Sequence, residues 1–224
     1  MPLFMGIDMG TTNIAALIVE IPSGDVRAVS VVPNDSEITG EEDRLRGRSE
    51  WDAERAAELA FKAAAEAAAR VDPQMIRGIG VTGQMHGVVL VSEDGRPLTP
   101  FIGWQDKRCD EKMPGSDRTY IDYMIELAGR DGFRREGCRP ATGYMGSTLF
   151  WLKENDALPD EPATPCFLPD YIVMRMTGHK PITDPTNAGS SGIFDVVSRR
   201  WDSSLIGRLG LQRVHLPEVR RAGE

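Results

Sequence analysis

The segment that most constrains the fold is an apolar strand that ends in an aspartate and then turns through glycine and two threonines, Met5-Gly6-Ile7-Asp8-Met9-Gly10-Thr11-Thr12-Asn13. A second apolar run, residues 14–19, follows it directly. The turn therefore connects two strands of a hairpin, and a phosphate-binding loop that runs from a strand into a helix and carries a lysine is excluded.

This turn has the chemistry of a phosphate cradle. Gly10 permits a close backbone approach, and successive N–H groups in such a turn form an anion-binding concavity. Thr11 and Thr12 add hydroxyl groups, and Asp8 is a hard oxygen ligand suited to Mg²⁺. The segment indicates a place for a metal-bound triphosphate, with a plain hairpin as the alternative.

Composition excludes several classes of partner. The 224 residues include 26 Lys and Arg against 34 Asp and Glu, which gives a net charge of −8 and a pI near 5.0. Neither nucleic acid nor an anionic membrane is expected as a partner. Cys109, Cys138 and Cys166 lack metal-ligand spacing, which favours free thiols in a reducing compartment. No apolar run approaches membrane-spanning length and no basic leader is present, so we expect a cytoplasmic protein.

The pattern of apolar residues predicts strands in the first third of the chain and helices later. Residues 3–8, 14–20 and 26–32 predict an antiparallel meander, and residues 76–81 and 88–91 predict two more strands. Ser49-Glu50-Trp51-Asp52 resembles a capping box that opens a helix to about Arg70. Further helices are predicted near residues 119–129, 147–155 and 169–176.

A dinucleotide-binding spacing at Gly78-Ile79-Gly80-Val81-Thr82-Gly83 is misleading, because a β-branched run follows it where that fingerprint requires a helix. Gln84, Met85 and His86 instead stand at a junction between two strands, where their side chains can point into a cleft. The alternative for His86 is a buried histidine whose ring is satisfied by a backbone carbonyl.

A second polar cluster follows an aromatic residue, in Gly103-Trp104-Gln105-Asp106-Lys107-Arg108. Sugars are held by such mixtures, because an aromatic face packs on C–H groups while amide, carboxylate and guanidinium groups bind hydroxyls. A core tryptophan beside a solvated charge run is the alternative. The polar run Thr183 to Gly192 fits a plain surface loop, which its composition favours, or a loop that lines a site.

Seven motifs, in order along nearly all 224 residues, resemble those of the FGGY carbohydrate kinases. The Gln-Met-His-Gly turn is similar to that of the xylulokinase and sedoheptulokinase branch, whereas glycerol kinases carry an Arg-Glu pair there. The motifs are Asp8-Met9-Gly10-Thr11-Thr12, Trp51-Asp52, Gly83-Gln84-Met85-His86-Gly87, Trp104-Gln105-Asp106-Lys107-Arg108, Thr142-Gly143-Tyr144 with Leu149-Phe150-Trp151-Leu152-Lys153, Leu168-Pro169-Asp170-Tyr171, and Thr183-Asp184 with Asn187-Ala188.

The resemblance implies an α/β fold, a ribonuclease H-like (actin-like ATPase) domain with a mixed five-stranded sheet flanked by helices. It implies transfer of the γ-phosphoryl group of ATP, with Mg²⁺, to a terminal hydroxyl of a ketose such as xylulose or sedoheptulose. By the same resemblance, Asp8 organises the metal and the reaction, and Gly10, Thr11 and Thr12 lie by the phosphates. The residues implied to face the sugar are Gln84, Met85, His86, Trp104, Asp106, Arg108 and Tyr144.

One departure limits the implied activity. The family's general base is an Asp in a Gly-Asp-Asn-type segment near the end of the first domain, and residues 197–224 contain no such segment. We therefore expect residues 1–224 to be a kinase N-terminal domain that is incomplete at its C-terminal end and lacks the second domain. Such a chain would hold a sugar without phosphorylating it. Its unpartnered surface would expose apolar area, which makes a homodimer possible.

Two alternatives belong to other classes. One is a non-catalytic sugar-binding or regulatory module that keeps the turns of the cleft. The other is a kinase of the actin-like fold that acts on a non-sugar substrate, such as a carboxylate. The Trp104 to Arg108 cluster favours a polyol over that second alternative.

Overall fold

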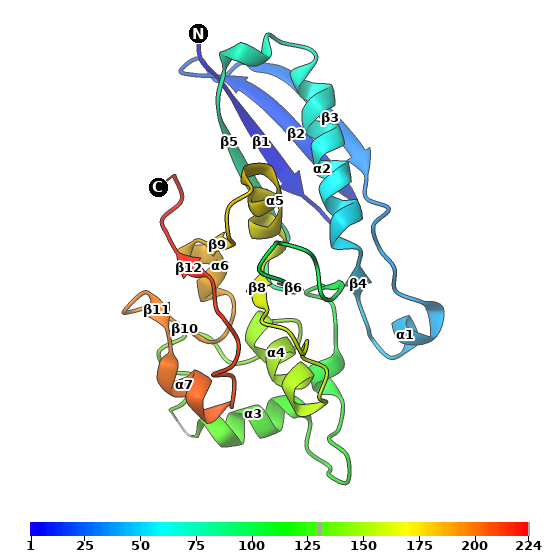
Figure 1. Cartoon of the computed structure of the whole chain (residues 1–224), viewed down its shortest axis with the longest axis vertical. Coiled ribbons are helices and arrows are strands. Elements are labelled where there is room, and N and C mark those ends of the chain that lie inside the picture. Colours follow the sequence, from blue (N-terminus) through cyan, green and yellow to red (C-terminus); the bar gives the residue numbers. More distant parts are fainter. Residues whose placement is uncertain (130, 224) are drawn as a thin grey trace.

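The computed structural model describes residues 1–129 and 131–223. Figure 1 shows two parts that follow one another along the long axis. One is built on a twisted sheet that contains the N-terminus, and the other consists of helices, short strands and loops.

The main sheet contains β1 (Leu3–Met9), β2 (Asn13–Glu20), β3 (Val26–Pro33) and β5 (Ile76–Gly83), in the order β3-β2-β1-β5. The first three strands form the predicted antiparallel meander, and β5 is parallel to β1. The sheet is therefore mixed, as expected.

The sheet has four strands among the described residues and not the predicted five. The fifth predicted strand forms as β6 (Val89–Val91), but it pairs antiparallel with β8 (Thr164–Cys166). His86 and Gly87 both have positive φ angles, 63° and 71°. Because these two residues turn the chain directly after β5, β6 leaves the main sheet.

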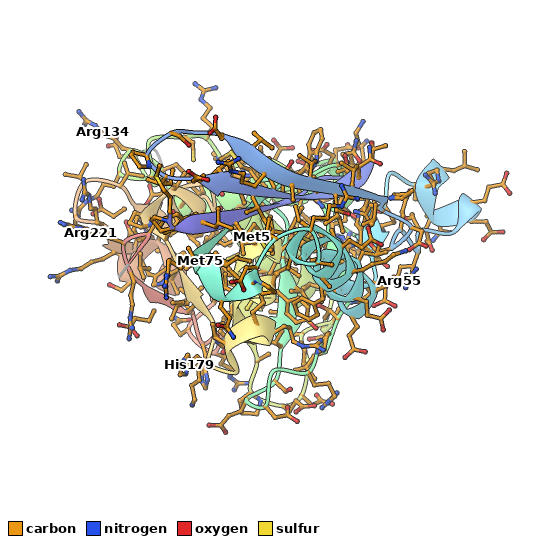
Figure 2. All side chains as sticks on the ribbon, turned by 90° about the horizontal axis from the view of Figure 1, so that it is seen from above. Met5, Arg55, Met75, Arg134, His179 and Arg221 are labelled. Atoms are coloured by element: carbon orange, nitrogen blue, oxygen red, sulfur yellow. The ribbon has the colours of Figure 1, made fainter. Side chains whose placement is uncertain are left out.

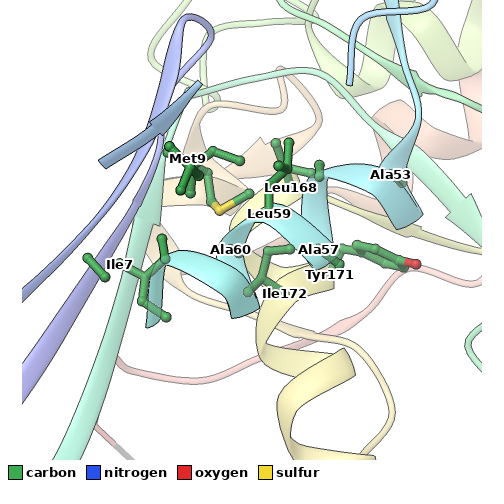
Figure 3. Packing of buried hydrophobic residues seen from close by; sticks show 14 of the residues in the cluster. Ile7, Met9, Ala53, Ala57, Leu59, Ala60, Leu168, Tyr171 and Ile172 are labelled. Carbon is green, nitrogen blue, oxygen red and sulfur yellow. The ribbon is translucent and has the colours of Figure 1, made fainter. Parts of the chain in front are cut away.

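One face of the sheet is covered by α2 (Ala53–Ala68) and α5 (Leu168–Thr177), which Figure 3 shows with their buried side chains. Alternate residues of β1 are buried, as a strand with one covered face requires. Small alanines such as Ala57 and Ala60 allow α2 to lie close to Ile7 and Met9.

The start of α2 differs from the prediction. Its N-cap is Asp52, whose side chain accepts a hydrogen bond from the N–H of Arg55 at 3.0 Å. Ser49 does not cap the helix, because the next two residues form β4 (Glu50–Trp51), which pairs with β7 (Phe101–Ile102).

The second part has its own core between α3 (Tyr120–Ala128), α4 (Met145–Glu154) and α7 (Ser203–Arg208). The helices predicted near residues 119–129, 147–155 and 169–176 are confirmed as α3, α4 and α5. The remaining elements are short: α1 (Glu41–Leu45), η1 (Pro73–Met75), η2 (Arg108–Asp110), β9 (Ile182–Thr183), α6 (Pro185–Gly189), β10 (Phe194–Asp195), β11 (Arg200–Trp201) and β12 (Glu218–Val219).

The three cysteines are free, as predicted. Figure 2, viewed down the long axis, shows Arg55, Arg134 and Arg221 extending from the outline, whereas Met5 lies within it. Within the described residues, no helix combines the length and the apolar character needed to cross a membrane.

Candidate functional site

The β1–β2 turn is a tight hairpin with an exposed aspartate at its entrance. Asp8 is exposed near the end of β1. A Cβ atom on Gly10 would lie 2.5 Å from the backbone oxygen of Asn13, so only glycine fits this conformation. The N–H groups of Thr11 and Thr12 form no hydrogen bond within the described residues. The turn therefore offers free donors beside a carboxylate, as the sequence predicted.

Asn34 holds this turn in place, and sequence reasoning missed it. Its side-chain amide donates to the carbonyl of Gly10 at 2.8 Å, and its backbone N–H donates to the carbonyl of Thr12 at 2.9 Å. The signal available in the sequence was a short Asn-Asp-Ser segment directly after the third predicted strand, a composition typical of turns that bond back to the chain.

The end of β5 lies against the end of β1. Met9 is paired with Gly83, and a Cβ atom on Gly83 would lie 2.6 Å from the Cβ of Met9. The N–H of Gln84 donates to the carbonyl of Met9 at 3.1 Å. Because β1 and β5 are parallel, their carboxyl ends bring the phosphate-cradle turn and the Gln84-Met85-His86 turn to the same edge of the sheet.

The Gln84 side chain has no partner. Its Oε1 and Nε2 atoms are both buried and make no hydrogen bond within the described residues. A buried amide without partners costs free energy, and such groups in native proteins call for an explanation. Met85, next to it, is 48% exposed. The amide can serve a hydroxyl-bearing ligand both as donor and as acceptor.

His86 is fixed at one ring nitrogen and open at the other. Its Nδ1 atom lies 2.9 Å from the carbonyl oxygen of Ser190. Because a carbonyl only accepts hydrogen bonds, we assign the proton to Nδ1, which leaves Nε2 as an acceptor in the neutral ring. Nε2 forms no hydrogen bond within the described residues. The carbonyl partner expected for a structural histidine is present, yet one edge of the ring stays free.

Ser190 belongs to the polar run 183–192, so that run lines the site through a backbone carbonyl. It contains α6, whose N-cap is Asp184. Asn187 of α6 donates to Asp170 of α5 at 3.4 Å. Asp170 is buried, and burial raises its pKa to about 7.

Tyr144 and Trp104 complete this edge. The Tyr144 ring stacks on His86 with a centroid distance of 4.2 Å and an interplanar angle of 14°. The N–H of Gly87 donates to the carbonyl of Gly143 at 2.9 Å, and a Cβ atom on Gly143 would lie 2.1 Å from the carbonyl oxygen of Trp104. The Trp104 side chain is 47% exposed. The structure therefore brings together the turn at 84–86, Trp104 and Tyr144.

Asp106 and Arg108 lie behind this surface as an ion pair. Asp106 is fully buried and accepts hydrogen bonds from the N–H of Ser49 at 2.8 Å and from Arg108 Nε at 2.8 Å. Arg108 also donates to Glu50 at 2.6 Å and lies over the ring of Trp151. Because these groups form hydrogen bonds within the protein, they fix the turn that carries Trp104. Their predicted contact with a sugar stays a prediction.

The site offers one carboxylate for a metal ion. No group of three or more His, Cys, Asp or Glu residues able to hold a metal occurs in residues 1–129 and 131–223. Mg²⁺ in phosphoryl-transfer sites is bound by one or two carboxylates together with the substrate phosphates. Asp8 beside the free N–H groups of the turn fits that mode of binding.

The chain resembles known carbohydrate kinases in sequence and in fold. Residues 3–224 match the model of the FGGY family of carbohydrate kinases, N-terminal domain. The xylulose kinase of Haemophilus influenzae is 32% identical over 89% of this chain and 39% of its own length, and the sedoheptulokinase of Mus musculus is 28% identical over 99% and 48%. The crystal structure of xylulose kinase from Rhodospirillum rubrum superposes with a TM-score of 0.81 at 25% identity, over 97% of this chain and 43% of that one. The chain thus spans less than half the length of these relatives.

Proposed function

Because the chain belongs to the FGGY family of carbohydrate kinases and matches the N-terminal domain of that family, we propose that it is the sugar-binding half of an ATP-dependent kinase. This kinase phosphorylates a terminal hydroxyl of a ketose. The similarity to a xylulose kinase and a sedoheptulokinase supports a ketose of this kind. The observation that carries the proposal is the buried, unpartnered amide of Gln84 beside the free edge of His86.

In the proposed complex the sugar lies over the turn at 84–86. The Gln84 amide donates to one hydroxyl and accepts from another, while His86 Nε2 accepts from a third. The exposed face of Trp104 packs on the C–H side of the sugar, and Met85 covers an apolar edge. Tyr144 holds the His86 ring by stacking.

The nucleotide half of the proposal uses the β1–β2 turn. The free N–H groups of Thr11 and Thr12 face the phosphates of ATP, Gly10 permits their close approach, and Asp8 holds Mg²⁺ directly or through its waters. The metal ion supplies charge neutralisation on the phosphoryl group during transfer. Positioning and charge neutralisation, more than covalent chemistry, would account for the rate.

We further propose that the general base and the adenine contacts come from polypeptide that this sequence does not contain, including a second domain. Asp184, Asp195 and Asp202 are the aspartates of the last fifth of the chain, and none lies in the Gly-rich turn expected for the base. Asp184 and Asp202 are N-caps and Asp195 ends β10, and each accepts hydrogen bonds from backbone N–H groups. The 224-residue chain therefore binds sugar without turning it over.

Calorimetric titration with xylulose, sedoheptulose and gluconate tests the proposal. We expect saturable binding of a ketose, at least tenfold weaker in His86→Ala, in line with the loss of one or two buried hydrogen bonds. His179→Ala, at an exposed histidine, is the matched control and should leave binding unchanged.

Other outcomes separate the alternatives. Binding of gluconate but of no ketose would favour a carboxylate kinase. Turnover of a ketose with ATP by the purified chain would refute the claim that the base lies elsewhere. Binding of none of the three ligands would overturn the sugar site itself.

A further inference from the structure

A basic pocket borders the turn that presents Trp104. The pocket has a volume of about 460 Å³ and lies between residues 44–49 and residues 105–107. Its charged lining residues are four cations and one acid: Arg44, Arg46, Arg48, Lys107 and Glu37. This is a local excess of positive charge on a protein whose net charge is −8.

The positive charge is only partly neutralised by neighbouring acids. Arg44 pairs with Glu37 at 3.0 Å, and Arg48 pairs with Glu111 through Nη2 at 2.8 Å. The other terminal nitrogen of Arg48, Nη1, is buried and makes no hydrogen bond within the described residues. A buried guanidinium donor without a partner costs free energy, and Arg48 is one of the residues that line the pocket.

Two more cations of the pocket have no acidic partner. Arg46 and Lys107 form no ion pair within residues 1–129 and 131–223. Both are exposed, so their head groups can reach an incoming ligand. Arginine forks and lysine ammonium groups together are the usual protein ligands of phosphate.

The pocket is held rigid by contacts within the protein. The N–H of Lys107 donates to the carbonyl of Gly47 at 2.8 Å, and Gly47 has a φ of 78°. A Cβ atom on Gly47 would lie 3.0 Å from the Cβ of Lys107, so the two segments touch. The Arg48 guanidinium stacks on Trp151 at 4.9 Å. The backbone of the pocket and the Arg48 side chain are therefore fixed before a ligand arrives.

We propose that this pocket binds the phosphate group of a small phosphomonoester. The net charge of −8 disfavours long polyanions, whereas a single phosphate is attracted by the local cations. The N–H of Asp106 donates to the carbonyl of Gly103 at 3.1 Å, which closes the turn shared by the pocket and Trp104. A phosphate bound here lies beside the sugar surface without occupying it. This inference goes beyond the proposed function and does not depend on it.

Calorimetric titration at low ionic strength with inorganic phosphate, fructose 6-phosphate and fructose tests the proposal. We expect saturable binding of a phosphate-bearing probe, weakened about tenfold or more in the double variant Arg46→Gln/Lys107→Gln and weakened by added NaCl. Binding of inorganic phosphate identifies the free ion as a sufficient ligand. Binding of fructose 6-phosphate alone shows that the phosphate must be carried by a sugar.

Two controls make the test decisive. Lys62→Gln removes one exposed charge from α2 and should not change binding, and Lys107→Arg, which keeps the charge, should bind like the unmodified chain. Each variant is first checked for an unchanged melting temperature. Absence of saturable binding of either phosphate probe, or equal weakening by Lys62→Gln, would overturn the proposal.

Discussion

At the scale of single residues, the Gln84 side chain that we propose binds the sugar also lowers the stability of the folded chain. Its buried amide has no partner, so Gln84→Leu, of similar volume, removes a desolvation penalty. We expect the free energy of unfolding to rise by about 1 kcal/mol while ketose binding weakens at least tenfold. Urea denaturation and titration measure the two effects. Gln74→Leu, at an exposed residue of η1, should change neither, and a destabilised Gln84→Leu chain would contradict the argument.

Asp170 is a residue whose protonation should affect stability. Burial raises its pKa to about 7 from an ordinary value of 3.8, with the nearby charge of Asp184 acting in the same direction. The folded state therefore binds this proton more tightly than the unfolded state. The stability that this Asp170 proton contributes is fully present below pH 4 and is lost as the pH rises from about 4 to about 7.

The variant Asp170→Asn tests the direction of this pH dependence. At pH 8 it should be more stable than the unmodified chain by roughly 1–3 kcal/mol, and near pH 4 the difference should vanish. Denaturation curves across this range provide the measurement. Burial also raises the pKa of Glu136 to about 7, so part of the pH dependence should remain in the variant. Parallel stability curves for the two proteins would show that Asp170 is not responsible.

At the scale of elements, the β1–β2 hairpin depends on a glycine for steric reasons. A Cβ atom at Gly10 would lie 2.5 Å from the backbone oxygen of Asn13, whereas one at Gly6, in the preceding strand β1, would meet nothing within 4 Å. Gly10→Ala should lower the free energy of unfolding by about 1–3 kcal/mol. Gly6→Ala should be neutral or raise it by up to about 1 kcal/mol. Thermal unfolding measures both, and equal effects would contradict the steric argument.

The sequence was informative wherever an element is determined by its own pattern. The meander of β1, β2 and β3 follows from alternation, and α3 follows from apolar spacing. The predicted start of α2 was wrong. Ser49 and Asp52 are both suitable N-caps, and the helix begins after Asp52 because β4, which follows Ser49 directly, pairs with residues 101–102. That pairing partner lies about 50 residues away, beyond the reach of a local pattern.

The same limit applies to the site. The turn at 10–12 and the turn at 84–86 were identified from residue types alone. Asn34 and Ser190 hold these turns from distant segments of the chain. The Asn34 side chain donates to the carbonyl of Gly10, and the backbone carbonyl of Ser190 accepts from His86. A backbone carbonyl leaves no trace in side-chain chemistry, so the role of Ser190 could not be predicted.

At the scale of the whole molecule, the sheet face opposite α2 stays apolar and exposed. Alternation places Phe4, Leu17, Val29 and Val31 on this face, with exposed fractions of 38%, 37%, 42% and 56%. Figure 3 shows α2 and the start of α5 packed on the other face. A contiguous apolar sheet face of this kind favours association.

We therefore expect the chain to self-associate as its concentration rises. The double variant Leu17→Thr/Val31→Thr places β-branched threonine at both strand positions and makes the face more polar, so it should shift sedimentation toward the monomer. Val197→Thr is the control, because Val197 is 81% exposed in a turn outside the sheet and its loss should have no effect. If the unmodified chain sediments as a monomer at high concentration, the exposed face does not drive association and the homodimer expected from the sequence is wrong. If association persists unchanged in the double variant, another surface mediates it.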